Sequence, residues 1–467
     1  MWKTLVNAGA RWIGYFLGRP PYNRRVSYDA SIAYLLSFAD FERTGHFQER
    51  PDVAPMLSLL HRLGNPHLGR RTVHVAGSKG KGSVSAMIES ILRASGQRTG
   101  LYTSPHLHDF TERIAVNGEP ISRETFARLV DDLRPAIEAE QAAGNDKLVT
   151  FDLLTALGFI AFREADVETQ VIEVGLGGRV DQTNVFETKE VAVITPLSYE
   201  HTAILGDRIE QIAAEKAAII TPGCVAVLAP QPYAEAAAVA RQFASAAGAR
   251  LVDVAAEYRW SVGDFSSRGQ TVQIDGPDVV IEARLPLLGA HQAENATTAV
   301  AAAHALRVPN DAIVRGLESV RWPGRVEVLS EEPLVVADGA HNADSARRLR
   351  ETLIEYFGAK QVTFIIGAGG DKDVAGLVEE LAPIATRVIA TRSKHPRAME
   401  PARVAEAFAR AGVNVEDSEN VSEAIERALA ASIGGGLICL AGSLFVAAEG
   451  REYFAKAPFS TGGLNGR

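Results

Sequence analysis

A glycine-rich loop between a short apolar run and an amphipathic stretch is the segment of the sequence best suited to chemistry. Residues 74–83 read HVAGSKGKGS. Glycines let the backbone turn its N–H groups toward phosphate oxygens, a following helix presents its positive end, and a lysine adds a point charge. We expect nucleotide phosphates to bind here, with Lys81 contacting them and acting in catalysis. The loop residues that we assign to the nucleotide are Gly77, Ser78, Gly80, Lys81, Gly82 and Ser83.

The loop departs from the usual pattern G-x-x-x-x-G-K-[ST]. Val75 stands at the position of its first glycine, Gly82 at that of its hydroxyl residue, and Ser83 follows one place later. The sequence contains no N-K-x-D motif to recognise guanine. These departures weigh against a generic GTPase. The alternative is a glycine-rich turn whose lysines face solvent.

Three polar side chains follow apolar runs that read as strands, namely Ser104, Glu173 and His201. Ligand-binding groups gather at the carboxyl ends of the strands in open α/β sheets, so these three are candidate ligand contacts. Glu173 has the alternative of an ion pair with Arg179. His201 has the alternative of a packed or solvated histidine, because a lone histidine is poor evidence for a site.

The elements that must position these groups alternate along the chain. Short apolar runs of the kind found in buried parallel strands alternate with helical patterns, which predicts a doubly wound α/β fold. The expected strands are Thr72–Ala76, Val171–Val174, Val191–Thr195, Val225–Ala229, Leu334–Ala337, Val362–Ile366, Val388–Thr391 and Leu437–Leu440. Residues 253–285 instead show two-residue alternation broken by glycines, which predicts a small antiparallel insert.

A break at Trp322-Pro323-Gly324-Arg325 predicts the domain organisation. We expect an N-terminal extension at residues 1–26, then a P-loop-type, doubly wound ATPase domain with the small β insert at residues 27–325. A smaller Rossmann-like α/β domain would occupy residues 326–467. The first 28 residues hold no Asp or Glu. A plain extension is the favoured interpretation of this basic arm, and a targeting segment is the alternative.

Composition limits the classes of function. The 467 residues include 48 Lys and Arg against 57 Asp and Glu, a formal net charge of -9, which disfavours a broad nucleic-acid interface. No segment reaches the ~20 apolar residues of a membrane span. The two cysteines, Cys224 and Cys439, suit neither a disulfide framework nor a zinc site. We expect a cytoplasmic monomer that acts on small molecules and binds neither nucleic acid nor membrane.

Further short blocks follow the loop in a fixed order. They are residues 102–107 (YTSPHL), 109–110 (DF), 112–114 (ERI), 173–184 (EVGLGGRVDQTN), 200–202 (EHT), 215–217 (EKA), 323–325 (PGR), 338–342 (DGAHN) and 442–445 (GSLF). Together with the loop they resemble the folylpolyglutamate synthase and dihydrofolate synthase family of the Mur ligase superfamily. The resemblance implies an ATP- and Mg²⁺-dependent ligase. Such an enzyme activates a carboxylate of a pterin substrate as an acyl phosphate and joins it to the amine of L-glutamate.

The resemblance also implies a metal site. Ser104 and Glu173 would hold the Mg²⁺ that bridges the nucleotide phosphates, and His201 with Glu173 would hold a second ion. Lys216 would lie beside this site, carbamylated in some family members, and we include it among the catalytic residues. Read alone, Lys216 is a lysine on the exposed face of a helix.

The remaining implied contacts come from both expected domains. Asn295 would bind adenine, Arg325 would reach the phosphates, and Asp338 with His341 would contact ribose or glutamate. Substrate contacts would come from Phe151 and Asp181 for the pterin, with His341 and Ser443 for glutamate. Four of these residues have an ordinary alternative: a polar helix residue (Asn295), a linker arginine (Arg325), a turn serine (Ser443) and a core aromatic (Phe151).

Several activities remain open. The shared blocks do not separate dihydrofolate synthase, which uses dihydropteroate, from folylpolyglutamate synthase, which extends a reduced folate. A cell-wall amino-acid ligase is a second possibility within the superfamily. A nucleotide-dependent switch without ligase activity is a possibility from a different class.

Overall fold

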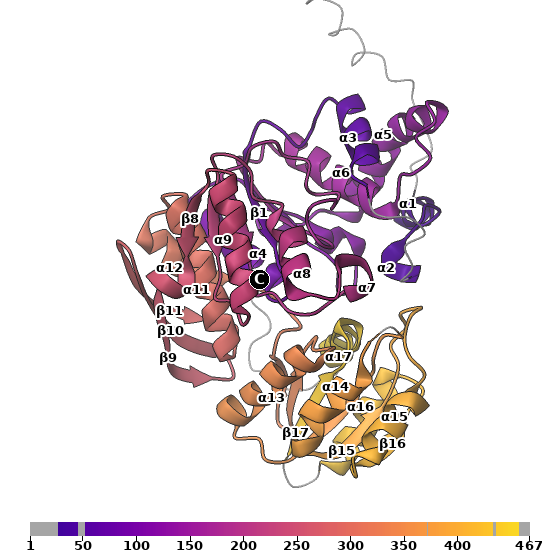
Figure 1. The fold of residues 1–467 in the computed structure, drawn as a ribbon. Helices are drawn as coiled ribbons and strands as arrows, with labels where there is room; N and C mark the ends of the chain where they lie inside the picture. Colours follow the sequence, from indigo (N-terminus) through magenta and orange to yellow (C-terminus); the bar gives the residue numbers. More distant parts are fainter. Residues whose placement is uncertain (1–26, 45–51, 371, 433–435, 457–467) are drawn as a thin grey trace, which may run out of the picture.

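The computed structural model describes residues 27–44, 52–370, 372–432 and 436–456. Two α/β domains are built on separate sheets (Figure 1). The expected fold class, a doubly wound α/β domain followed by a smaller α/β domain, is confirmed. The basic arm at residues 1–26 lies outside the described residues, and the exact domain bounds stay a prediction.

The first domain holds an eight-stranded sheet with the order β4-β3-β2-β5-β1-β6-β7-β8. Six neighbouring strands in this order are parallel, namely β2, β5, β1, β6, β7 and β8. Strands β3 and β4 add an antiparallel edge. The strands are β1 (Arg71–Ala76), β2 (Thr99–Tyr102), β3 (Ile114–Val116), β4 (Glu119–Pro120), β5 (Thr169–Glu173), β6 (Val191–Ile194), β7 (Val225–Leu228) and β8 (Arg250–Asp253). Val75 lies opposite Glu173 in the register of β1 and β5. The loop after β1 therefore starts beside the Glu173 carboxylate.

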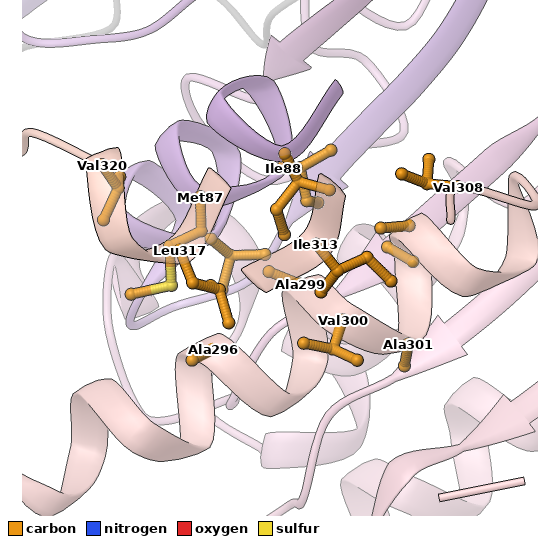
Figure 2. Packing of buried hydrophobic residues seen from close by; sticks show 14 of the residues in the cluster. Met87, Ile88, Ala296, Ala299, Val300, Ala301, Val308, Ile313, Leu317 and Val320 are labelled. Carbon is orange, nitrogen blue, oxygen red and sulfur yellow. The ribbon is translucent and has the colours of Figure 1, made fainter. Parts of the chain in front are cut away.

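The helices of this domain pack against the sheet and against one another. They are α1 (Tyr28–Leu35), α2 (Phe41–Thr44), α3 (Ala54–Arg62), α4 (Lys81–Ala94), α5 (Arg123–Ala142), α6 (Thr150–Glu164), α7 (Thr202–Leu205), α8 (Ile209–Ala217), α9 (Ala234–Ala246), α10 (Val254–Glu257), α11 (Ala290–Ala305) and α12 (Asn310–Ser319), with a 3₁₀ turn η1 (Phe110–Arg113). Figure 2 shows Met87 and Ile88 of α4 against Ala296 and Ala299 of α11 and Leu317 of α12, all fully buried. This packing fixes the helix that follows the phosphate loop.

The antiparallel insert is confirmed and also contacts the second domain. Its strands β9 (Arg259–Ser266), β10 (Gly269–Gly276) and β11 (Val279–Leu285) form a three-stranded sheet. The Tyr356 hydroxyl donates to Gln270 Oε1 at 2.5 Å, and the Phe265 and Tyr356 rings lie 4.6 Å apart. Ser267 Oγ donates to Glu331 Oε1 at 2.7 Å. The insert thus links the two domains on one side.

The second domain holds a six-stranded sheet, parallel except for β12, with the order β12-β13-β17-β14-β15-β16. Its elements are β12 (Glu327–Glu331), β13 (Leu334–Ala337), α13 (Ala343–Phe357), β14 (Val362–Ile366), α14 (Val374–Leu381), η2 (Ala382–Ile384), β15 (Ala385–Ala390), α15 (Pro401–Arg410), β16 (Asn414–Asp417), α16 (Val421–Ala431), β17 (Leu437–Ala441) and α17 (Leu444–Lys456). Apolar clusters cover both faces of the sheet. Across the described ranges, no helix is long and apolar enough to cross a lipid bilayer.

Candidate functional site

A cleft of about 680 Å³ receives side chains from both domains. Of the residues expected at the site, all except Gly77 and Lys216 line it. Those on its wall are Ser78, Gly80, Lys81, Gly82, Ser83, Ser104, Phe151, Glu173, Asp181, His201, Asn295, Arg325, Asp338, His341 and Ser443. Residues separated by more than 300 positions in the chain therefore meet around one space.

The phosphate loop runs from β1 into the first turn of α4 on this wall. Gly80 occupies the N-cap position with φ 81°, and α4 begins without a side-chain cap. A Cβ at Gly80 would lie 2.4 Å from Asn295 Oδ1, so only glycine allows α11 to approach this closely. The uncapped N–H groups and the helix dipole provide the donors that an anion needs.

Ser78 has a more structural position than its assignment to nucleotide implies. Its N–H and that of Lys79 donate to the Pro196 carbonyl at 3.1 Å and 3.0 Å. Its hydroxyl donates to the Ser198 carbonyl at 3.1 Å. These bonds fix the curvature of the loop and use the N–H groups of residues 78 and 79. The N–H groups that a phosphate could accept from are therefore those of residues 80–83, at the start of α4.

Lys216 lies behind the loop. Its Nζ donates to the Gly77 carbonyl at 2.8 Å and to Glu200 Oε1 at 2.9 Å, and Glu200 Oε2 lies 3.7 Å from Lys79 Nζ. The side chain of Lys216 is only 2% exposed, so the interpretation as a solvent-facing lysine was wrong. Burial lowers the Lys216 pKa, whereas Glu200 opposes the shift. Carbamylation of Lys216 stays a prediction. It would turn an ammonium group that donates to two acceptors, the Gly77 carbonyl and Glu200, into an anion.

The charge balance around Glu200 depends on these lysines. Burial alone would raise the pKa of Glu200, but Lys216, Lys81 and Lys79 outweigh it and hold the pKa well below its usual range. The carboxylate is therefore ionised across the neutral range. Because a buried carboxylate needs its counterion, the pair is a stability element as well as a brace for the loop.

Replacement of Lys216 by Met should destabilise the protein by about 3 kcal/mol, because it leaves the Glu200 charge with weaker compensation. The double variant Lys216→Met/Glu200→Gln should lose clearly less than the two single variants together. Urea denaturation of all four proteins in a double-mutant cycle measures this coupling. Additive losses would contradict the role of the pair.

Glu173 ends β5 at the base of the cleft. Its Oε2 accepts a hydrogen bond from the Ser104 backbone N–H at 3.2 Å. Arg179 pairs instead with Glu215, at 3.0 Å, so the alternative of a Glu173–Arg179 pair was wrong. Burial raises the Glu173 pKa to about 7, and the nearby Lys81 opposes the shift. A cation nearby would favour the ionised form of this carboxylate, as Lys81 does.

His201 begins the short helix α7 with a left-handed backbone, φ 50°. Its side chain faces the cleft, yet the surrounding protein and the nearby Lys216 lower its pKa to about 4, against the opposing effect of Glu200. The ring is therefore neutral near pH 7 and has a nitrogen lone pair to offer. The residue is exposed on the cleft wall, so the solvated alternative describes its position better than the packed one.

Asn295 and Arg325 come from different elements and both line the cleft. Asn295 on α11 is 6% exposed, and its Nδ2 donates to Gln292 Oε1 at 3.0 Å. Arg325, in the connection to the second domain, lines the cleft and donates from Nη1 to the Gly324 carbonyl at 3.0 Å. Both are cleft residues and not merely helix or linker residues.

The second domain contributes Asp338, His341 and Ser443. Asp338 Oδ2 accepts from the Val326 N–H at 2.9 Å and Oδ1 from the Ala340 N–H at 2.8 Å, so its carboxylate ties down the connection that follows Arg325. His341 Nδ1 lies 2.8 Å from the Gly339 carbonyl, and burial lowers its pKa to about 3. Ser443 Oγ accepts from the Phe445 N–H at 3.2 Å, as a turn serine does, while still lining the cleft.

Phe151 and Asp181 lie together on a separate part of the wall. A Cβ on Gly175 would lie 2.6 Å from Phe151 Cζ and 3.2 Å from Asp181 Oδ2, so the glycine permits this close approach. Phe151 packs against the apolar cluster around α6 and also lines the cleft, so the core and site interpretations both hold. An aromatic face beside a carboxylate suits a flat heterocycle with N–H donors.

Sequence reasoning missed a group of polar residues farther along the cleft. Arg113 Nη1 donates to Glu42 Oε1 at 3.1 Å, and Arg113 Nε lies 3.0 Å from His106 Nδ1. Arg397 Nη1, from the second domain, donates to the Glu42 carbonyl at 2.8 Å. Arg113 and His106 lie within the quoted blocks, but Glu42 comes from the four-residue helix α2, which no motif marks.

Comparisons with known proteins agree with this arrangement. Two protein families match: the Mur ligase middle domain at residues 75–303, and the Mur ligase glutamate ligase domain at residues 324–444. The dihydrofolate synthase/folylpolyglutamate synthase of Mycobacterium tuberculosis is 33% identical over 445 residues, 90% of each chain. The chain belongs to the folylpolyglutamate synthase/dihydrofolate synthase family.

Other members of this family extend the comparison. A probable bifunctional folylpolyglutamate synthase/dihydropteroate synthase of Haloferax volcanii is 37% identical over 420 residues, 88% of this chain and 49% of the relative. The chain thus spans about half the length of that protein. The structure of Escherichia coli FolC in complex with DHPP and ADP superposes with a TM-score of 0.81 at 28% identity, covering 92% of this chain and 98% of that one. The family resemblance read from the sequence is confirmed.

Proposed function

We propose that the protein is an ATP-dependent ligase that couples L-glutamate to a carboxylate of a pterin substrate, dihydropteroate or a reduced folate. The observation that carries the proposal is the cleft itself. It joins an uncapped phosphate loop, an aromatic and carboxylate wall, and polar groups of a second domain. A ligase needs these three parts around one space, because nucleotide, acid and amine must meet there.

The nucleotide fits the first of these parts. The first turn of α4 offers N–H donors, Lys81 lies at its start, and the Gly80 approach to Asn295 leaves an amide that can both donate and accept near the loop. Arg325 supplies a planar cation from the connection between the domains. In this proposal, the nucleotide phosphates lie on the loop, and Asn295 contacts the adenine ring.

The donor set also fits Mg²⁺. Ser104 and Glu173 offer a hydroxyl and a carboxylate, and His201 offers a neutral ring. Within the described part of the chain, no cluster of three or more His, Cys, Asp and Glu is placed to hold a metal. Mg²⁺ keeps several of its waters and needs only one or two protein ligands, so Ser104 and Glu173 would suffice for one ion. When bound, Mg²⁺ would offset negative charge on the phosphates.

The chemistry proceeds in two displacements. A carboxylate oxygen of the pterin substrate attacks the γ-phosphorus of ATP, the bond to the ADP oxygen breaks, and an acyl phosphate forms. The neutral amine of glutamate then attacks the acyl carbon, loses its proton, and phosphate leaves. Lys81 would stabilise charge that develops on the transferred group, and closure of the cleft around the substrates would limit attack by water.

The two substrates have separate places in the proposal. Phe151 and Asp181 would receive the pterin ring, whose N–H groups suit a carboxylate acceptor. His341 and Ser443, in the second domain, would receive the incoming glutamate. Their entry from opposite domains would bring the amine to the acyl phosphate only when both domains contribute.

One assay tests the proposal. The pure protein is incubated with ATP, Mg²⁺ and L-glutamate, together with either dihydropteroate or tetrahydrofolate, and the products are weighed by mass spectrometry. We expect a product heavier by one glutamate residue for at least one pterin, with one ADP per bond. If neither pterin is extended, the ligase proposal fails, and ADP formation without a product would favour the nucleotide switch. Extension of a muramyl substrate instead would favour the cell-wall ligase.

A further inference from the structure

A continuous chain of hydrogen bonds runs from the protein interior to the Asp181 carboxylate. Lys189 Nζ lies 2.9 Å from His74 Nδ1, and His74 Nε2 lies 2.9 Å from Thr183 Oγ1. Thr183 Oγ1 in turn donates to Asp181 Oδ1. The exposed fractions are 6% for Lys189, 0% for His74, 0% for Thr183 and 2% for Asp181. Only Asp181 reaches the cleft wall.

The donors and acceptors fix the direction of this chain. An ionised carboxylate only accepts, so the Thr183 hydroxyl must donate to Asp181 and accept from His74 Nε2–H. His74 then carries its proton on Nε2 and offers the Nδ1 lone pair to Lys189, whose Nζ donates. Lys189 Nζ also lies 3.4 Å from Asn184 Oδ1, a second acceptor. Each side chain therefore holds the next in one orientation.

The surroundings determine which protonation states the chain can adopt. Burial lowers the pKa of His74 well below its usual range, with Lys189 adding to the effect, so the ring stays neutral. Burial lowers the Lys189 pKa to about 7 and raises that of Asp181. The Asp181 charge acts on two titratable groups of neighbouring elements, Asp152 on α6 and Tyr102 on β2, and raises the pKa of both.

Asp152 acts against ionisation of Asp181. Burial raises the pKa of Asp152 to about 7, and the Asp181 charge contributes to that shift. At the Lys189 end of the hydrogen-bonded chain, the Phe186 ring lies 5.6 Å from Lys189 Nζ, and Cys224 is near the same amine. Backbone N–H groups of Leu176 and Thr183 donate to Asp181 at 2.8 Å and 3.0 Å. The Thr183 hydroxyl is thus the side-chain donor that ties Asp181 to the buried lysine.

We propose that Lys189, His74 and Thr183 are positioning residues that keep Asp181 ionised and fixed on the cleft wall, where it accepts hydrogen bonds from the N–H groups of the pterin ring. The inference rests on the proposed function and deepens it, because it assigns the control of pterin recognition to residues that do not touch the substrate. None of the three lines the cleft.

The test compares pterin binding in four proteins: wild type, Thr183→Val, Thr183→Ser and Lys189→Met. Binding of dihydropteroate or tetrahydrofolate in the presence of ADP is measured by calorimetry between about pH 6 and pH 9. Thr183→Val keeps the shape but removes the donor to the charged form, which raises the Asp181 pKa. We expect binding about tenfold weaker near neutral pH, with its loss on acidification starting about one pH unit higher.

The other variants separate positioning from packing. Thr183→Ser keeps the hydroxyl and should restore the wild-type pH profile, and Lys189→Met should shift it in the same direction as Thr183→Val. ADP affinity should stay within about twofold of wild type in all of them. A Thr183→Val protein whose pterin affinity falls equally at every pH, or does not fall, overturns the proposed role of the hydrogen-bonded chain from Lys189 to Asp181. Wild-type protein that binds neither pterin overturns the proposed function together with it.

Discussion

Lys81→Ala should lower kcat/KM for ATP by about 10²- to 10³-fold, the usual cost of removing one preorganised group that stabilises transition-state charge. Lys81 begins α4 on the wall of the cleft, beside the uncapped first turn. The variant should still fold, because the backbone bonds and apolar packing that fix α4 do not use the Lys81 side chain. Steady-state kinetics with ATP varied, and a circular dichroism spectrum, measure the two outcomes.

A matched lysine controls for the loss of one positive charge. Lys360 is exposed between α13 and β14 and lies outside the cleft. Lys360→Ala should retain kcat/KM within about twofold, because exposed charges far from a site contribute little. Near-normal turnover of Lys81→Ala would refute the phosphate role of this lysine.

Glu173→Gln should abolish turnover and yet stabilise the protein at alkaline pH. The side chain is 4% exposed, and burial raises its pKa to about 7. Above that pH the folded protein holds an ionised carboxylate at a cost in stability, which a neutral amide avoids. A shift of this size corresponds to a gain of at most about 3 kcal/mol.

The sign of this effect depends on pH. The folded-state pKa of Glu173 lies above that of the unfolded chain, so the folded protein binds more protons and loses stability as pH rises through about 7. Urea denaturation should show the full gain of Glu173→Gln near pH 8 and almost none near pH 5. Glu187→Gln, at an exposed glutamate, should show neither effect. An equal gain at both pH values would contradict the assigned cause.

Much of the fold was predictable because several segments carry a strong local pattern. Strands β1, β5, β6 and β7 are apolar runs buried on both faces, and each was expected within two residues of its bounds. The strands that were missed lack such runs. β2 reads TGLY, and Gly100 is placed there because a Cβ would lie 2.6 Å from the Phe162 ring. The edge strand β16, NVED, is too short and polar for a pattern.

The candidate site was predictable where motifs carry the chemistry, and less so where tertiary packing decides it. The loop and Glu173 are recognised by type and context. Burial of Lys216 depends on the fit between α8 and the loop, which no spacing along one helix encodes. Asp338 matched a ligand position, yet the fold directs its carboxylate to two backbone N–H groups. Glu42 enters the cleft only because α2 packs beside Arg113.

The small β insert makes the two sides of the domain interface unequal. On its side, the Phe265–Tyr356 ring contact and the Tyr356–Gln270 bond combine apolar and buried polar contacts. On the other side, the partly exposed side chains of His108 and Glu452 lie 3.0 Å apart, and Arg397 donates to the Glu42 carbonyl at 2.8 Å. Salt weakens contacts between exposed charges more than it weakens apolar and buried polar contacts. Rising ionic strength should therefore loosen the interface on the side opposite the insert and widen the cleft there. Substrate access would change, while the contacts of the insert keep the two domains together.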